Sequence, residues 1–147
     1  MAADFAYFDT SVLVKRYVRE VGSRQAAQLL RRYRFLSSAL VSVEALSAFS
    51  RRKTAGELSE RSFSAIVARI RSDRDHWELV ELTPAVLSRA EETIEKVKVR
   101  TLDALHIASA LVFQDLSGMH VSFITADEQQ RDGARLVGLP VTWVGSV

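Results

Sequence analysis

Short apolar runs alternate with longer segments of helical periodicity along this chain. The apolar runs predict buried strands over residues 5–8, 35–40, 77–82, 121–125 and 141–144. Between them apolar residues recur every three or four positions, which is the spacing of one helix face. These segments predict helices over residues 11–19, 23–34, 43–54, 60–74, 84–97, 102–116 and 127–136. Strands that alternate with helices, with no clear hairpin signal, predict an α/β fold whose mostly parallel sheet of four to five short strands is covered on both faces.

Several predicted helix ends carry capping or breaking residues. Ser42, Ser59 and Thr101 stand immediately before helical periodicity and are predicted as N-caps. Pro84 occupies the first position of its predicted helix, where the missing N–H costs nothing. Gly118 follows the predicted helix that ends near residue 116 and stops it. These signals support the helix boundaries that the periodicity predicts.

Length and composition predict one globular domain over residues 1–147. A chain of this length can bury about 68–70% of the surface that its unfolded form exposes. It contains no cysteine, which excludes disulfides and thiolate metal sites and fits a reducing, cytoplasmic location. No basic stretch precedes an apolar run at the start, so no signal peptide is expected. No run of about 18 apolar residues predicts a membrane span.

The net charge of +2 hides an uneven distribution. Residues 15–74 hold fourteen Lys and Arg against five Asp and Glu, a surplus of nine. The rest of the chain holds six basic residues and thirteen acids, a deficit of seven. A basic part beside an acidic part suits a protein that grips a phosphate backbone and holds cations elsewhere. Solvated helix faces rich in arginine explain the same pattern without any ligand.

Four acids stand where a predicted strand ends or a predicted helix begins: Asp9, Glu44, Asp103 and Asp127. In an open α/β sheet these positions gather around a crevice at the carboxyl ends of the strands. Carboxylates that converge there repel one another by roughly 4 kcal/mol per pair at 4 Å and an effective dielectric of 20. Divalent cations or bound protons relieve that repulsion. The first of these options suggests a magnesium- or manganese-dependent enzyme that acts on phosphate esters.

The settings of these acids carry a family likeness. The motifs are YFDTSVLVK around Asp9, SVEAL around Glu44, RTLDALHIA around Asp103 and ITAD ending at Asp127. Together, in this order and context, they resemble the signatures of the PIN-domain nucleases. Within that family, the length of the chain and the residues of its motifs are most similar to those of the VapC toxins of prokaryotic toxin–antitoxin pairs.

The resemblance implies a three-layer α/β/α sandwich with Mg²⁺ or Mn²⁺ in an acidic pocket. It also implies an RNA substrate, a homodimer and a small VapB-like antitoxin whose tail blocks the site. The positions that match the family's acidic quartet and its two accompanying hydroxyl residues are Asp9, Glu44, Asp103, Asp127, Ser11 and Thr125. On this likeness the four acids are the catalytic and metal-binding residues, with the two hydroxyls in support.

Each acid of the quartet also has a purely structural explanation. Asp9 and Asp127 can serve as helix N-caps, since Asp favours that position. Glu44 and Asp103 lie in a first helical turn, where the helix dipole favours a negative charge by about 0.3–1 kcal/mol. Glu128 and Asp132 are further acids whose part in the site stays open.

Helix geometry sorts two neighbours of the third acid. His106 follows Asp103 by three residues and faces roughly the same side, so it either orients a ligand or is a satisfied core histidine. Asp115 lies twelve residues beyond Asp103, about 18 Å along the same helix, and falls outside the pocket.

Three classes of function remain for this sequence. A metal-dependent endoribonuclease uses all four acids and needs no protein nucleophile. An aspartyl-phosphate phosphatase usually carries a second acid two residues after the first, but here that position is Ser11. A non-catalytic RNA- or protein-binding module has no use for four repelling charges. The sequence therefore predicts the nuclease first.

Overall fold

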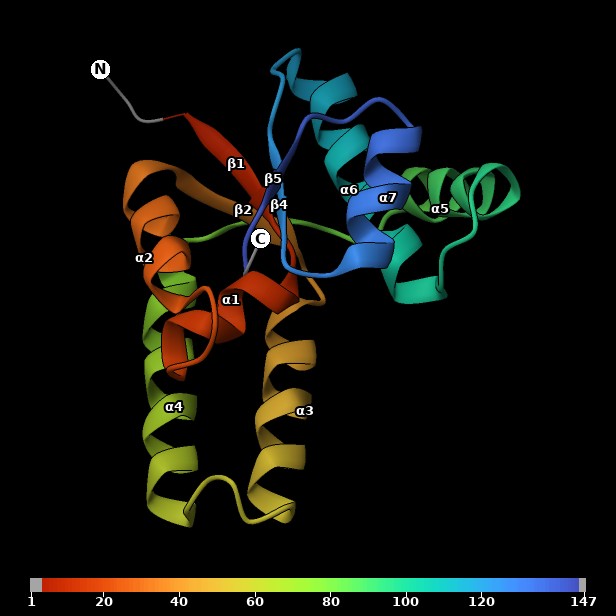
Figure 1. Ribbon diagram of the computed structural model, residues 1–147. Coiled ribbons are helices and arrows are strands. Elements are labelled where there is room, and N and C mark those ends of the chain that lie inside the picture. Colours follow the sequence, from red (N-terminus) through yellow and green to blue (C-terminus); the bar gives the residue numbers. More distant parts are fainter. Residues whose placement is uncertain (1–3, 146–147) are drawn as a thin grey trace.

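The computed structural model describes residues 4–145, in which a five-stranded parallel sheet is covered by helices on both faces (Figure 1). The strands are β1 (Phe5–Phe8), β2 (Arg34–Ser38), β3 (Glu78–Val80), β4 (Phe123–Thr125) and β5 (Val141–Trp143). The helices are α1 (Thr10–Tyr17), α2 (Ser23–Arg32), α3 (Val41–Thr54), α4 (Glu60–Asp73), the 3-10 turn η1 (Arg74–His76), α5 (Pro84–Lys96), α6 (Thr101–Ser117) and α7 (Glu128–Leu136). The fold class predicted from the sequence, a three-layer α/β/α sandwich, is confirmed.

The strand order β3-β2-β1-β4-β5 places the first strand in the middle of the sheet. Tyr7 of β1 is in register with Leu36 of β2 on one side and with Phe123 of β4 on the other. The chain therefore winds outward from β1 in one direction and later returns to its other side. Such a reversal opens a crevice at the carboxyl ends of the two strands concerned, here β1 and β4.

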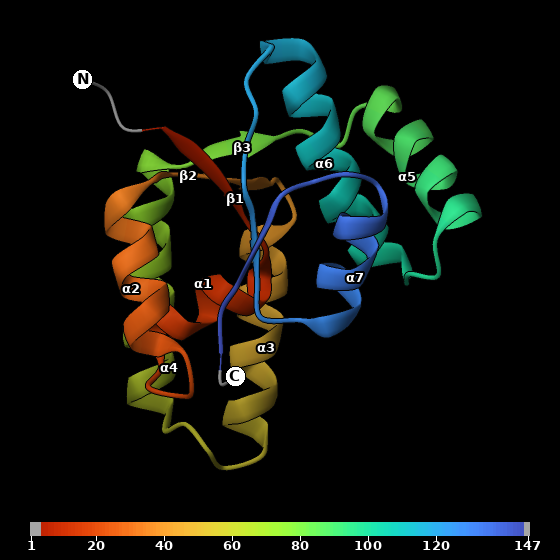
Figure 2. The ribbon, with the colours of Figure 1, turned by 45° about the horizontal axis from the view of Figure 1, so that its top comes forward.

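Successive residues of β1 pack on opposite faces of the sheet, as strand geometry requires. Phe8 packs with Phe49 and Ile70 in the core cluster that joins the sheet to α1, α3 and α4. Tyr7 packs with Ile107 in a second cluster that joins the other face to α6 and α7. Helix α5 lies outside α6, as Figure 2 shows, and packs on it through a third cluster. The helical layers therefore clamp β1 from both sides.

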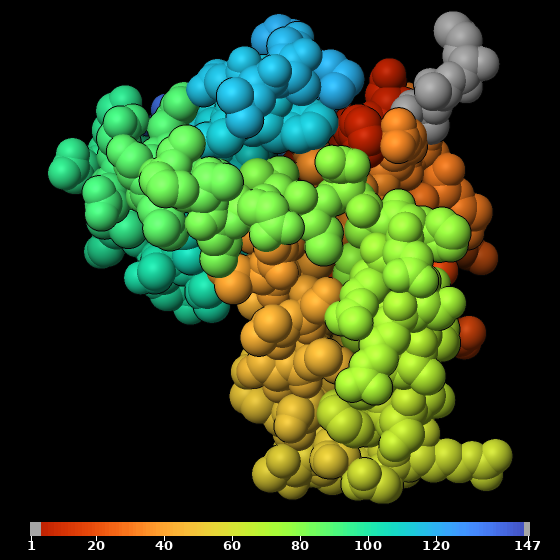
Figure 3. Space-filling view, turned by 180° about the vertical axis from the view of Figure 1, so that it is seen from behind, coloured from red at the N-terminus to blue at the C-terminus, as the bar shows by residue number. Residues whose placement is uncertain are grey.

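Helices α3 and α4 form a pair that extends beyond the sheet (Figures 1 and 3). These helices, with α2 and the end of α1, lie in the part of the chain from residue 15 to residue 74 that carries the basic surplus. Figure 1 shows α1–α4 at the lower left and α5–α7 at the upper right. The charge asymmetry of the sequence is therefore also a separation in space, and we refer to residues 15–74 as the basic lobe.

Two of the predicted helix caps are wrong by one or two residues. Helix α3 begins at Val41, so Ser42 lies inside it. Helix α6 begins at Thr101, and Arg100 stands in the N-cap position. There the Asp103 carboxylate accepts a hydrogen bond from the Arg100 backbone N–H, so the acid in the first turn does the work expected of a cap.

Other predicted boundaries are confirmed. Ser59 caps α4 by accepting from the Ser62 N–H at 3.0 Å, and Pro84 opens α5. Gly118 ends α6 in the left-handed region at φ 73°. Strand β3 is shorter than the predicted 77–82, since Trp77 is the C-cap residue of η1 and the strand ends at Val80. Across residues 4–145, none of the helices combines the length and apolar character needed to cross a bilayer.

Gly133 allows α7 to approach the segment that leads into α6. A Cβ atom at this position would stand 2.7 Å from Val99 Cγ1 and 3.1 Å from Ile107 Cδ1. We expect Gly133→Ala to lower the free energy of unfolding by about 1–3 kcal/mol, because overpacking outweighs the gain in helix propensity of about 1 kcal/mol. Urea unfolding measures the change. Gln129→Ala, an exposed change on the same helix, is the control, and an equally stable Gly133→Ala protein would contradict the prediction.

Candidate functional site

Asp9 is a buried carboxylate at the point where β1 ends and α1 begins. Its Oδ1 accepts hydrogen bonds from Ser11 Oγ at 2.6 Å and from the Val12 N–H at 3.3 Å. Its Oδ2 accepts from Thr125 Oγ1 at 2.5 Å. Asp9 thus caps α1 and also places a carboxylate at the carboxyl end of the central strand β1, so a structural role and a role as a ligand are compatible.

Burial raises the pKa of Asp9 from 3.8 to about 6. The nearby His106 and the hydrogen bonds from Ser11, Thr125 and Val12 act in the opposite direction. Burial outweighs them. A charged Asp9 is therefore held at a cost in this fold, and a cation beside it would lower that cost.

The β4–α7 turn is fastened to Asp9 through two hydroxyls. Thr125 Oγ1, which donates to Asp9, accepts the backbone N–H of Asp127 at 3.0 Å. Ser11 Oγ, which also donates to Asp9, accepts the backbone N–H of Ala126 at 2.9 Å. Asp127 in turn caps α7. Ser11 and Thr125, predicted as supporting residues, thus link the first and fourth acids of the quartet.

Glu44 lies in the first turn of α3 and is held by side chains from two other elements. Its Oε1 accepts from Thr10 Oγ1 at 3.0 Å and lies 2.6 Å from His106 Nε2. His106 is fully buried, and its Nδ1 lies 2.8 Å from the Tyr7 hydroxyl. Burial raises the pKa of Tyr7 well above its ordinary value, so its hydroxyl keeps its proton beside the histidine ring.

Asp103 is the third residue of α6 and faces the N-cap residue of its own helix. Its Oδ2 accepts from the backbone N–H and from Nε of Arg100, both at 3.3 Å. The same guanidinium reaches Asp127, with Nη2 and Oδ2 separated by 3.7 Å. Arg100 therefore lies between the third and fourth acids, with its side chain 70% exposed.

These contacts, with two links made by the chain itself, connect the four acids into one network of residues, which we call the acidic circuit. Its members in order are Asp9, Thr125, Asp127, Arg100, Asp103, His106, Glu44 and Thr10. The chain itself completes it, since Thr10 follows Asp9 and helix α6 joins Asp103 to His106. The four acids, distant in sequence, are thus connected through intermediate residues near the carboxyl ends of β1 and β4.

Carboxylate oxygens of this kind suit a hard dication such as Mg²⁺ or Mn²⁺. Four acids around one arginine also leave a surplus of negative charge. Within residues 4–145, however, no three Asp, Glu or His side chains are arranged as a metal-coordinating group. The contacts explain this, because hydroxyls hold the Asp9 oxygens and Arg100 stands between Asp103 and Asp127. The donor set fits a dication in chemistry, and side chains must move to receive one.

Several acids weighed from the sequence lie apart from the contacts of the acidic circuit. Asp132 is exposed and pairs with Arg131 at 2.9 Å, and Glu128 is exposed at the start of α7. Asp115 pairs with Arg89 at 2.8 Å near the far end of α6.

Three residues that contact the acids or their partners were not identified from the sequence, namely Arg100, Thr10 and Tyr7. The spacing of Arg100, three residues before Asp103 on a helix, was the available signal. Tyr7 gives no such signal, since an aromatic residue in a buried strand is read as core.

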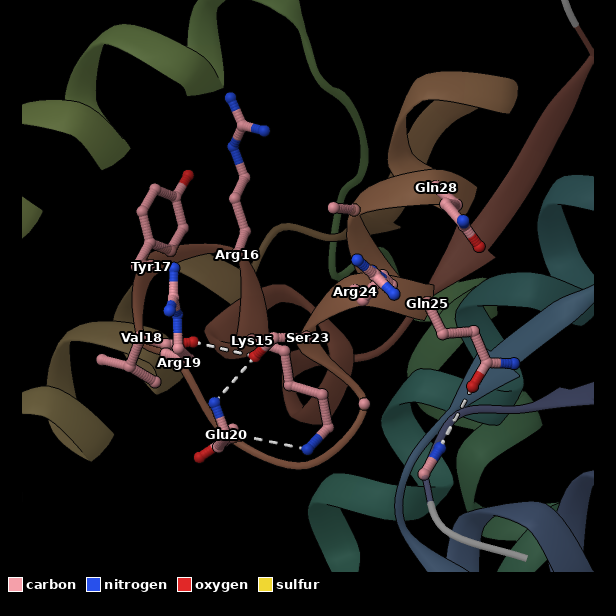
Figure 4. A pocket seen from close by; sticks show the side chains of 13 residues that line it. Lys15, Arg16, Tyr17, Val18, Arg19, Glu20, Ser23, Arg24, Gln25 and Gln28 are labelled. Carbon is pink, nitrogen blue, oxygen red and sulfur yellow. Dashed lines mark hydrogen bonds and ion pairs between the residues drawn. The ribbon is translucent and has the colours of Figure 1, made fainter.

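A hollow of about 920 Å³ lies away from the acidic circuit, along the end of α1, the following turn and α2 (Figure 4). It belongs to the basic lobe, and its cations include Lys15, Arg16, Arg19 and Arg24. Lys15 Nζ donates to Glu20 Oε1 at 3.1 Å and to the Val21 carbonyl at 2.6 Å. None of the four acids lines this hollow. The hollow and the acidic circuit are therefore separate features.

The chain matches the family model of the PIN domain over residues 6–136. Because the match spans most of its length, the chain belongs to the PIN-domain family, as the motifs around the four acids predicted. No curated protein matches it at a significant level.

Solved structures similar to this one come from toxin–antitoxin systems. A toxin–antitoxin complex from Klebsiella pneumoniae matches with TM-score 0.65 and 18% identity, over 93% of this chain and 95% of that chain. VapBC2 from Rickettsia felis, bound to a DNA fragment from its promoter, matches with TM-score 0.66 and 11% identity, over 95% and 98%. VapBC-5 from Mycobacterium tuberculosis matches with TM-score 0.55 and 16% identity, over 96% and 98%. At these identities the likeness shows a shared fold, and the predicted resemblance to VapC-type PIN proteins is confirmed at that level.

The raised pKa of Asp9 makes the stability of the metal-free protein depend on pH. Between pH 3.8 and about 6 the folded state binds a proton that the unfolded state has lost, so stability falls as pH rises through this window. Asp9→Asn removes the titration. We therefore expect the stability of Asp9→Asn relative to the wild type to rise by about 2 kcal/mol between pH 4 and pH 7.5. Urea unfolding of both proteins in EDTA measures it, and an equal difference at both pH values would contradict it.

Proposed function

We propose that this protein is a metal-dependent endoribonuclease and the toxin component of a toxin–antitoxin pair. The observation that carries the proposal is the acidic circuit, whose contacts connect the four acids through intermediate residues near the carboxyl ends of β1 and β4. Membership of the PIN-domain family supports the nuclease class. The shared fold with chains from VapBC systems supports the toxin role.

In this proposal Asp9, Asp103 and Asp127, helped by Glu44, hold one or two Mg²⁺ or Mn²⁺ ions. Such an ion, when bound, supplies the Lewis acidity that phosphodiester hydrolysis needs. The buried Asp9 gives the site a carboxylate in a fixed position, because Ser11 and Thr125 both donate hydrogen bonds to it. Carboxylates fixed in this way need little rearrangement to receive a cation, and the cation would stabilise the negative charge that develops on the phosphate.

The remaining residues of the acidic circuit hold the ligands in place. His106, anchored by Tyr7 in the second core cluster, fixes the carboxylate of Glu44 together with Thr10. Partners of this kind orient ligands and are often as necessary as the ligands themselves. The Thr10 hydroxyl lies 3.4 Å from His106 Nε2, but both groups are engaged with Glu44, so water is the nucleophile that this site favours.

RNA as the substrate and an antitoxin as the partner extend the proposal. The basic lobe offers the surplus of nine positive charges over residues 15–74 that a phosphate backbone favours. A small VapB-like antitoxin is the expected protein partner, because the similar solved structures come from toxin–antitoxin systems. A homodimer in the cytoplasm remains the expectation for the assembled toxin.

The rival classes make different use of Asp9. A phosphatase of the aspartyl-phosphate type needs an accessible carboxylate with a second acid two residues on. Here Asp9 is fully buried, and Ser11 donates a hydrogen bond to it. A non-catalytic binding module needs no gathered acids. The acidic circuit therefore favours the nuclease over both alternatives.

Removing the charge of a single ligand tests the proposal. We expect Asp9→Asn and Asp103→Asn each to reduce manganese-dependent cleavage of single-stranded RNA by at least about a hundredfold, because the metal contributes several kcal/mol of charge stabilisation. A gel assay of a labelled RNA, with and without EDTA, measures the rate. Asp115→Asn is the control, since that acid lies on α6 outside the acidic circuit.

Two substrates, RNA and a phosphomonoester, separate the classes in the same assay. The nuclease cleaves RNA but leaves a phosphomonoester intact, whereas a phosphatase does the reverse. A binding module retains RNA without cleaving it in either condition. Full activity of Asp9→Asn or Asp103→Asn, with circular dichroism showing folded protein, would exclude the assigned site.

A further inference from the structure

Arg100 is the cation that stands between two acids of the acidic circuit. Its Nε lies 3.3 Å from Asp103 Oδ2, and its Nη2 lies 3.7 Å from Asp127 Oδ2. The two carboxylates thus share one guanidinium, although one belongs to α6 and the other caps α7. A shared cation lowers the repulsion that two neighbouring carboxylates would otherwise feel.

The exposure of the three partners is unequal. The Asp103 side chain is 5% exposed and that of Asp127 is 32% exposed, whereas the Arg100 side chain is 70% exposed. The acids are therefore fixed in the fold, and the arginine reaches them from the solvent side. An ion pair of such exposure contributes little to stability, about 1 kcal/mol at most. Arg100 is placed to leave its partners at low cost.

The helix does not depend on the guanidinium. The Asp103 carboxylate accepts the backbone N–H of Arg100 at 3.3 Å, and this bond is available to any residue at the position except proline. Replacing the side chain therefore leaves the start of α6 capped. The contacts of the Arg100 guanidinium with Asp103 and Asp127 are therefore not needed to start the helix.

We propose that Arg100 is a displaceable counter-cation of the acidic site, an inference that rests on the metal site of the proposed function. In the metal-free protein its guanidinium balances Asp103 and Asp127. A dication that takes the same two carboxylates excludes the guanidinium by charge and by space, so the two cations compete. Arg100 thereby stabilises the metal-free arrangement of the two acids slightly and raises the metal concentration needed to fill the site.

The affinity for manganese tests this competition directly. We expect Arg100→Gln to bind Mn²⁺ more tightly than the wild type, by a factor on the order of five, because the competing charge is gone. Arg100→Lys keeps a charge and falls between the two. Titration of the EDTA-treated and dialysed proteins, followed by electron paramagnetic resonance of free Mn²⁺, gives the dissociation constants without any turnover.

Arg89→Gln is the matched control. Arg89 is also an ion-paired arginine, 2.8 Å from Asp115 of α6, but its partners lie outside the acidic circuit. Arg89→Gln changes the net charge of the protein by the same amount as Arg100→Gln does. We expect its manganese affinity to equal that of the wild type.

Thermodynamic linkage supplies a second readout that a merely structural arginine would not produce. Arg100→Gln is expected to be less stable than the wild type in EDTA, because Asp103 and Asp127 lose their shared cation. Saturating Mn²⁺ replaces that cation, so the deficit in the folding equilibrium constant shrinks by the same factor by which affinity has risen. Chemical unfolding in EDTA and in excess manganese measures both deficits.

The outcomes separate this inference from the proposed function. If Arg100→Gln binds manganese as tightly as the wild type or more weakly, the role of Arg100 as a counter-cation is overturned. The metal site itself would be unaffected by that result. An equal gain in Arg89→Gln would also overturn it, since the effect would then be one of net charge. If neither the wild type nor Arg100→Gln binds manganese, the metal site fails and the inference fails with it.

Discussion

The burial of one carboxylate, that of Asp9, is the constraint on which the rest of the site depends. A charged group without water needs partners, and Asp9 takes them from the start of α1 and from the end of β4. Because Thr125 and Ser11 also accept backbone N–H groups of the β4–α7 turn, satisfying Asp9 fixes that turn. The position of Asp127 follows from this, and with it the start of α7. One unfavourable burial therefore organises the neighbouring elements.

The other half of the site is built differently, because buried aromatic side chains there hold a carboxylate that is partly open to solvent. Tyr7 and His106 are fully buried and reach Glu44, which is partly open to solvent. Their ring contact, 5.8 Å between centroids, packs the sheet against α6 while it aligns the hydrogen bonds. The same helix carries Asp103, so the packing of α6 on the sheet sets two acids at once. Core packing and the chemistry of the site are thus not separable here.

Periodicity predicted the order of strands and helices, because burial repeats every two residues in a strand and every three to four in a helix. The settings of the four acids pointed to one edge of a parallel sheet for the same reason. Local patterns did not contain the rest. Ser42 and Thr101 look like caps, but α3 begins at Val41 and Arg100 holds the N-cap position of α6. The bridge from Arg100 to Asp127 and the reach of Tyr7 to His106 join distant segments, and no spacing along the chain reports them.

The hydrogen bond from Thr125 to Asp9 spans 116 residues and therefore carries a consequence for how the protein is made. A ribosome adds about 5–20 residues per second, so β4 is made some seconds after β1. Until β4 emerges, β1 lacks its neighbour on that side, and Asp9 has only the partners from the start of α1, Ser11 and Val12. A nascent chain that stops before β4 therefore lacks the hydrogen bond that joins Asp9 to the β4–α7 turn.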